Sequence, residues 1–181
     1  MKRMVGMMER MTVLAVLVCA LLPRAAWAVE HFFYNQYGSV AVSELGITTE
    51  GSELVYCLGI VAPKGHSLGK VVFATGPLIE GSIFEGGTFS SAGSSFIVTG
   101  KGNYGEHKGT IFAGQFRGKI HWTLVSKSGA NLVFELRGPI EGQLYTGRVV
   151  DLSAIETIAT TENELAKGVG HIVTGQVIGY P

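Results

Sequence analysis

Residues 119–137 read KIHWTLVSKSGANLVFELR and contain the clearest structural signal in the chain. Apolar side chains occupy every second position in both halves: Ile120, Trp122 and Leu124, then Leu132, Phe134 and Leu136. This period of two places one face of a β-strand in a core. Ser128-Gly129 lies between the halves and is typical of a turn. The stretch therefore predicts an antiparallel hairpin with one buried face.

Comparable apolar segments, separated by glycine-rich turns, recur along the chain. Those outside the hairpin are 39–45, 54–61, 70–75, 82–90, 95–100, 110–116, 143–149, 155–161 and 171–178. Their spacing, often about 8–12 residues, is typical of an all-β sandwich or barrel. We predict a single antiparallel, glycine-rich β-barrel or β-sandwich of about nine or ten strands. Thr161-Glu162-Asn163-Glu164 has the form of a capping box, so a short helix or a polar loop follows 155–161.

Two segments resemble each other and suggest that one corner is used twice. Gly76-Pro77-Leu78-Ile79-Glu80-Gly81 is similar to Gly138-Pro139-Ile140-Glu141-Gly142, with Leu78 as an insertion. Proline fixes φ and glycine avoids a steric conflict, so each segment predicts a turn between strands. If the corners lie together, Glu80 and Glu141 are candidates for a catalytic pair of carboxylates.

The N-terminus has the parts of a secretory signal peptide. Lys2 and Arg3 precede an uncharged apolar run over 11–22, MTVLAVLVCALL. That run is shorter than the roughly 20 residues that a membrane-spanning helix needs. Ala26 and Ala28 then supply the small residues of a cleavage site, so we expect the cut between Ala28 and Val29. The alternative is an uncleaved N-terminal anchor.

Removal of residues 1–28 changes the charge of the chain. This segment holds 4 of the 14 Lys and Arg residues and 1 of the 14 Asp and Glu residues, which leaves 10 basic and 13 acidic residues in 29–181. A mildly acidic domain without basic runs is not expected to bind nucleic acid. We expect 29–181 to form a single domain, secreted or periplasmic, with no stable membrane span after processing. An outer-membrane barrel is a further option, although several strands are short for one and carry charges.

The sequence offers no metal or nucleophile motif. The histidines His31, His66, His107, His121 and His171 are not spaced as local metal ligands, so we predict no metal and no cofactor. Residues 100–105 spell G-x-G-x-x-G, but a strand follows, whereas phosphate binding needs a helix N-terminus. Cys57 lies in the apolar run LVYCLGIV, which favours burial over a reactive thiol or an intermolecular bridge.

Residues 93–118, GSSFIVTGKGNYGEHKGTIFAGQFRG, are similar to the glycine-rich strands of small antiparallel barrels of the allene oxide cyclase and dirigent type. The resemblance rests on glycines and alternating apolar residues. It implies a barrel and assigns no catalytic role to any residue of this chain.

Function is therefore predicted only in outline. We expect an exported, non-enzymatic β-domain with a binding or structural role, whose partner is a small molecule, a glycan or a protein. The alternatives are a barrel that holds an apolar ligand and a barrel enzyme, hydrolase or cyclase-like, that uses Glu80 and Glu141. Candidate binding residues are Trp122 in the hairpin, which the core explains better, and Tyr104 and His107 in the most polar loop.

Overall fold

The computed structural model describes residues 30–179, so the expected signal peptide and the Ala28–Val29 bond lie outside the described residues. The elements in chain order are β1 (Glu30–Gln36), β2 (Ser39–Ser43), β3 (Gly46–Thr49), β4 (Ser52–Cys57), β5 (Ile60–Val61), β6 (Gly69–Ala74), β7 (Leu78–Ser82), β8 (Gly86–Phe89), β9 (Ser95–Gly100), β10 (Gly109–Phe116), β11 (Ile120–Ser128), β12 (Asn131–Leu144), β13 (Val149–Thr161), α2 (Glu162–Leu165) and β14 (Val169–Gly179).

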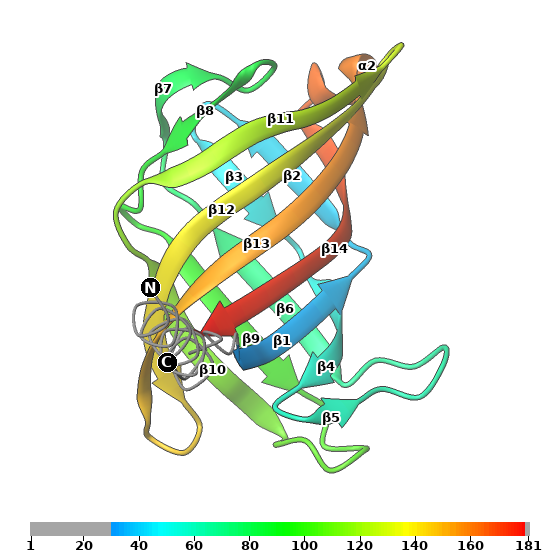
Figure 1. Cartoon of the computed structure of the whole chain (residues 1–181), viewed down its shortest axis with the longest axis vertical. Coiled ribbons are helices and arrows are strands. Elements are labelled where there is room, and N and C mark those ends of the chain that lie inside the picture. The colour runs from blue at the N-terminus through cyan, green and yellow to red at the C-terminus, as the bar shows by residue number, and fades with distance from the viewer. Residues whose placement is uncertain (1–29, 180–181) are drawn as a thin grey trace, which may run out of the picture.

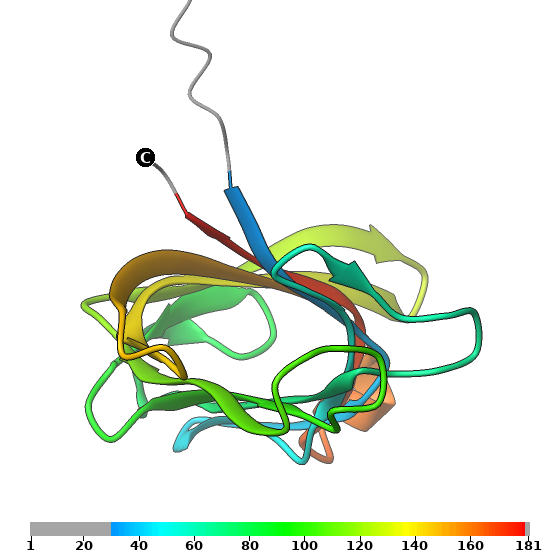
Figure 2. The ribbon, with the colours of Figure 1, turned by 90° about the horizontal axis from the view of Figure 1, so that it is seen from below.

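Eight strands form a closed antiparallel barrel (Figures 1 and 2). The ring runs β1-β14-β13-β12-β10-β9-β6-β4 and returns to β1. Of the two predicted architectures, the barrel is therefore the correct one. Closure gives the ring strands partners on both sides and so removes free edges. The additional strands β2, β3, β5, β7, β8 and β11 extend the wall at both ends of the ring.

The hairpin over 119–137 is confirmed as β11 and β12, paired from His121 with Arg137 to Ser128 with Asn131. However, β12 continues through Pro139 to Leu144, where a turn was expected. Pro139 is tolerated because β12 changes its neighbour there from β11 to β10. The Pro139 carbonyl accepts a hydrogen bond from the Arg117 N–H across this junction (2.8 Å). The N–H that proline lacks would point toward the same junction between β11 and β10, so its absence breaks no regular strand pairing.

Three further expectations about strands and turns are wrong. Residues 82–90 are not one strand but part of the β7–β8 hairpin, because Gly86 has a positive φ of 108° just after the turn. Residues 143–149 contain a turn between β12 and β13. The repeated corner is also wrong, since Gly76-Pro77 precedes β7 whereas Gly138-Pro139 lies inside β12.

The barrel interior is filled by aromatic side chains. Phe33, Phe96 and Phe112 are each 0% exposed, so no water-sized space adjoins them. Phe96 contacts Phe112 edge-on, with the ring centroids 6.3 Å apart. Gly114 and Gly142 face each other on β10 and β12, and a Cβ at either would collide with the Phe112 ring. The missing side chain of Gly114 therefore leaves room for the Phe112 ring.

The short helix α2 follows the capping signal at Thr161. The Thr161 hydroxyl accepts from the Glu164 N–H at 3.2 Å, and the Glu164 carboxylate accepts from the Thr161 N–H at 3.0 Å. These two bonds form the predicted capping box. Within residues 30–179, no helix is long and apolar enough to cross a membrane.

Candidate ligand-binding groove

The outer face of β1 and its two neighbours carries two rows of side chains. One row contains Tyr56, Tyr34 and Gln176, paired across β4, β1 and β14, and the other contains Glu53, Gln36 and Thr174. Because side chains alternate along a strand, Asn35 between Tyr34 and Gln36 faces the barrel interior and is 1% exposed. The outer face thus presents aromatic and polar groups together.

A β-bulge in β4 enlarges this face. Tyr34 pairs with Tyr56 but Asn35 pairs with Leu54, so Val55 is an extra residue on β4. Val55 and Tyr56 are both partly exposed, whereas Leu54 on one side of them is buried. A bulge of this kind commonly redirects a side chain.

Residues 58–68, here called the arm, stand over this face (Figures 1 and 2). Leu58 and Gly59 both have positive φ, 48° and 94°, and reverse the chain from β4 into β5. The arm is tied to β4 at both ends. The Val55 carbonyl accepts from the Ala62 N–H (2.8 Å), and the Leu54 carbonyl accepts from the Leu68 N–H (2.7 Å).

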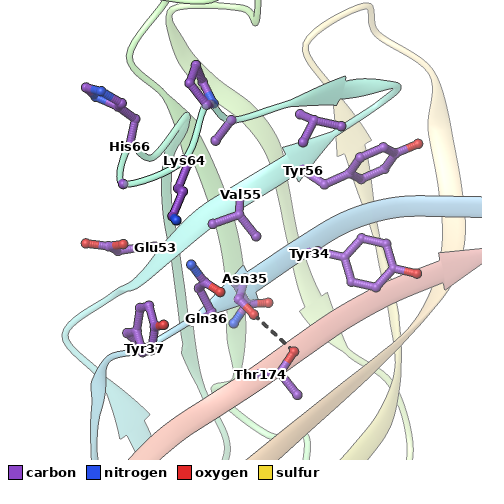
Figure 3. Close-up of a pocket in the computed structure, with 14 residues that line it drawn as sticks. Tyr34, Asn35, Gln36, Tyr37, Glu53, Val55, Tyr56, Lys64, His66 and Thr174 are labelled. Atoms are coloured by element: carbon purple, nitrogen blue, oxygen red, sulfur yellow. Dashed lines mark hydrogen bonds between the residues drawn. The ribbon is translucent and has the colours of Figure 1, made fainter.

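Between the arm and the two rows lies a groove of about 650 Å³. This volume is within the range of small-molecule sites, about 300–1,000 Å³. Figure 3 shows Tyr34 and Tyr56 side by side at one end, with Tyr37 and Glu53 toward the other and Lys64 and His66 on the arm. The Tyr34 and Tyr56 rings meet edge to face, with centroids 5.5 Å apart. The groove can therefore offer ring surfaces, hydrogen-bond donors and hydrogen-bond acceptors to one ligand.

Directly behind the groove, inside the barrel, lies a buried polar cluster of Asn35, Ser52 and Glu156. The Asn35 amide donates to the Ser52 hydroxyl (2.6 Å) and to Glu156 Oε2 (2.9 Å). Gly175 of β14 pairs with both Asn35 and Glu156, and its missing side chain leaves the space that these two groups occupy. Asn35 Oδ1 and Glu156 Oε1 have no hydrogen-bond partner among the described residues.

Burial sets the protonation state of this cluster. Glu156 is 0% exposed, and loss of hydration raises the pKa of its carboxyl group to about 8, although the bond from Asn35 opposes the shift. A charged carboxylate without a cationic partner is strongly disfavoured in such surroundings. We therefore treat Glu156 as a neutral carboxylic acid at neutral pH.

The two predicted catalytic carboxylates belong to separate surface ion pairs. Glu80 on β7 lies 3.9 Å from Lys119, and Glu141 on β12 lies 3.4 Å from Arg117. The strand register leads from Glu80 through β8 and β11 to Arg137, four residues before Glu141. With about 4.8 Å between strands and about 3.3 Å per residue, their Cα atoms are roughly 20 Å apart along the sheet. The two carboxylates are not brought into one site.

The three predicted binding residues have different surroundings. Trp122 is 1% exposed and stacks on Phe134 with the ring centroids 4.2 Å apart, so it is part of the core. Tyr104 contacts His66 with centroids 5.8 Å apart and so lies beside the groove. His107 stacks on Tyr145, which does not line the groove.

Cys57 is buried, as expected from its apolar run. Burial first, and the charge of Glu106 second, raise the pKa of its thiol to about 11. A thiol in this state is a poor nucleophile. Within the described part of the chain, no group of three or more His, Cys, Asp or Glu residues is arranged to hold a metal ion.

Sequence reasoning missed most of the groove and the buried cluster. No strand was predicted before residue 39, so β1, which carries Tyr34 and Gln36, was not expected. The groove side chains come from β1, β4, β14 and the arm, so no local spacing relates them. One feature of the sequence pointed to Glu156. It is an acidic residue inside a segment predicted to be a strand, between Ile155 and Thr157.

Comparisons with protein-family models, with curated proteins and with solved structures found no match to this chain.

Proposed function

We propose that this chain is an exported, non-enzymatic binding protein and that the groove between the arm and the outer face of β1 and β4 holds its ligand. The observation that carries the proposal is the size and lining of the groove: about 650 Å³, with the rings of Tyr34 and Tyr56 beside Glu53 and Lys64. A concave site with a few convergent polar groups is the usual form of a small-molecule site.

The position of the groove favours this function over a ligand inside the barrel. Phe33, Phe96 and Phe112 fill the interior and are 0% exposed. An apolar ligand would have to displace these rings, and removing a large buried side chain from a core costs about 3–5 kcal/mol. The groove can be occupied without any such change.

The proposal is tested by mapping where small molecules bind. The full chain is expressed in an exporting host and purified as it accumulates, and N-terminal sequencing then checks for Val29. Two-dimensional NMR spectra are recorded with a library of uncharged, acidic and basic fragments. Saturable shifts should cluster at residues such as Gln36, Val55 and Thr174. Clustering elsewhere, or at no site, would contradict the groove as the functional site, and a retained Met1 would contradict export.

A further inference from the structure

We infer that the ligand of the groove is a neutral carbohydrate, an inference that rests on the proposed function. Three properties of the groove lead to it: the form of its aromatic surface, the balance of its polar groups, and the state of the backbone beneath it. The balance of the polar groups also argues against an anionic ligand, and the pairing of the backbone argues against an extended peptide.

The aromatic surface available to a ligand consists of Tyr56 at one end of the groove and Tyr37, which is 62% exposed, toward the other. Tyr34 is engaged on one side by His31, whose ring stacks on it at a centroid distance of 5.0 Å and whose Nδ1 lies 2.5 Å from the Tyr34 hydroxyl. Tyr34 is thereby fixed and meets the Tyr56 ring at 72°. Tyr56 is only half-buried, so it can offer surface to a ligand. The C–H face of a sugar ring packs well on such a half-exposed aromatic ring.

The polar groups that line the groove include both hydrogen-bond donors and hydrogen-bond acceptors. The amide of Gln36 and the hydroxyls of Tyr37 and Thr174 do both, the carboxylate of Glu53 accepts, and the ammonium group of Lys64 donates. Among the lining residues, the hydrogen bond drawn in Figure 3 joins the Thr174 hydroxyl to the Asn35 carbonyl (3.5 Å). The other polar side chains there are not bonded to one another. Sugar hydroxyls also donate and accept, so they match this mixture.

The charge of the lining argues against an anionic ligand. Glu53 and Lys64 supply one negative and one positive charge. Phosphate and carboxylate sites instead gather arginine or lysine side chains, or backbone N–H groups at a helix N-terminus. A neutral ligand fits this balanced pair better.

The backbone under the groove argues against an extended peptide. β1 is paired with β14 on one side and with β4 on the other. β4 is paired with β1 on one side and with β5 and β6 on the other. A peptide that adds a strand needs a free edge, and the strands that form this surface do not offer one.

The test combines a glycan array with NMR titration of the full chain from the exporting host. The array carries neutral and acidic glycans, and the titrations use cellohexaose, chitohexaose, maltohexaose and xylohexaose. Oligogalacturonate and adenosine diphosphate are the anionic probes. We expect at least one neutral glycan to give saturable shifts at Gln36, Val55 and Thr174, with an affinity that does not depend on salt.

Variants relate the binding to the aromatic surface. Tyr56→Ala should weaken binding of that glycan about tenfold, while Tyr56→Phe should retain the stacking. Tyr145→Ala is the matched control, since Tyr145 is 51% exposed but lies away from the groove. The Tyr145→Ala variant should bind that glycan as tightly as wild type does. Because Tyr56→Ala could disturb the fold, Gln36→Ala is a second variant that removes a polar contact to the ligand. Dispersed NMR spectra check that each variant is folded.

The outcomes separate the two proposals. If fragments or anionic probes saturate the groove and no neutral glycan does, the carbohydrate inference is overturned while the binding groove stands. If nothing binds in the groove, both proposals fail. Equal loss of binding in Tyr56→Ala and Tyr145→Ala would also overturn the inference.

Discussion

Replacement of Glu156 by glutamine should remove most of the pH dependence that this buried side chain imposes on stability. The carboxyl group is 0% exposed, and its pKa rises from an ordinary value of 4.5 to about 8 in the folded chain. Between these two values the folded chain holds a proton that the unfolded chain releases. The stabilising contribution of this proton is complete below about pH 4.5 and is lost as the pH rises through about 8.

The magnitude follows from the size of that window. One pKa unit corresponds to about 1.4 kcal/mol, so the free energy of unfolding should fall by about 1.4 kcal/mol for each pH unit inside the window. Between pH 5 and pH 7 this amounts to about 2–3 kcal/mol, because titration in the unfolded chain is incomplete at pH 5. Such a loss is a large part of the stability of an ordinary domain, about 5–15 kcal/mol.

The assay is urea unfolding, followed by tryptophan fluorescence, of wild type and Glu156→Gln between pH 5 and pH 8. Glutamine keeps the shape of the side chain but cannot ionise. The difference in unfolding free energy between the variant and wild type should therefore move by about 2–3 kcal/mol in favour of the variant from pH 5 to pH 7. Glu85→Gln, which removes an exposed carboxylate in the β7–β8 turn, is the control for the loss of one negative charge.

Parallel stability profiles for wild type and Glu156→Gln would refute the reasoning. They would mean that the carboxyl group titrates alike in the folded and unfolded chains, and hence that it is hydrated or paired in the folded state. A profile in which wild type gains stability relative to the variant as the pH rises would refute the sign.

Three other substitutions or probes test separate parts of the structure. Gly175→Ala should destabilise the fold by about 3 kcal/mol or more, because its Cβ would overlap the Glu156 carboxylate and the Asn35 amide oxygen; an unchanged urea midpoint would contradict this packing. Leu58→Asn should raise the melting temperature and increase the free energy of unfolding by about 1 kcal/mol. The reason is that Leu58 has a φ of 48° in a two-residue turn, where asparagine before glycine is favoured. A lower melting temperature would show that the Leu58 side chain matters more than its backbone conformation. Cys57 should react with a thiol reagent only as fast as the chain unfolds, since burial raises its pKa to about 11, and rapid labelling of the native chain would contradict its burial.

The parts of the fold that were best predicted from sequence are the strictly alternating hairpin and the short apolar segment 95–100. The β11–β12 hairpin was predicted because Trp122 and Phe134 occupy alternating positions beside a clear turn signal, and both prove to be buried. The strand 95–100 was also predicted with its observed bounds. In both cases the local pattern agrees with the tertiary environment.

The strands that were missed break that pattern for identifiable reasons. β1 contains a register shift between His31 and Phe33, so Phe32 and Phe33 are both buried and no alternation is visible. β12 passes through Pro139, which normally marks the end of a strand. Its position at a change of neighbouring strand becomes apparent only when the barrel is closed.

The candidate site was beyond sequence reasoning because it is made by closure. Tyr34 and Thr174 are 140 positions apart in the chain, yet they lie on adjacent strands, β1 and β14. Glu156 was obscured by its own surroundings, because an acidic residue in a strand is normally assigned to the outer face. Here the glycine at position 175 on the neighbouring strand creates the space that admits it.

The buried cluster and the groove share the same short segment, and this arrangement has a consequence for binding. Asn35 is held from inside the barrel by Ser52 and Glu156, while its neighbours Tyr34 and Gln36 line the groove outside. Inner hydrogen bonds that fix the backbone of β1 also fix the positions of these two outer side chains. A preordered groove loses less conformational entropy when a ligand binds, so a weakly interacting neutral ligand can still be held. On this argument the polar cluster contributes more to the geometry of the groove than to stability, because a neutral carboxyl group with an unpartnered oxygen is a poor source of folding energy.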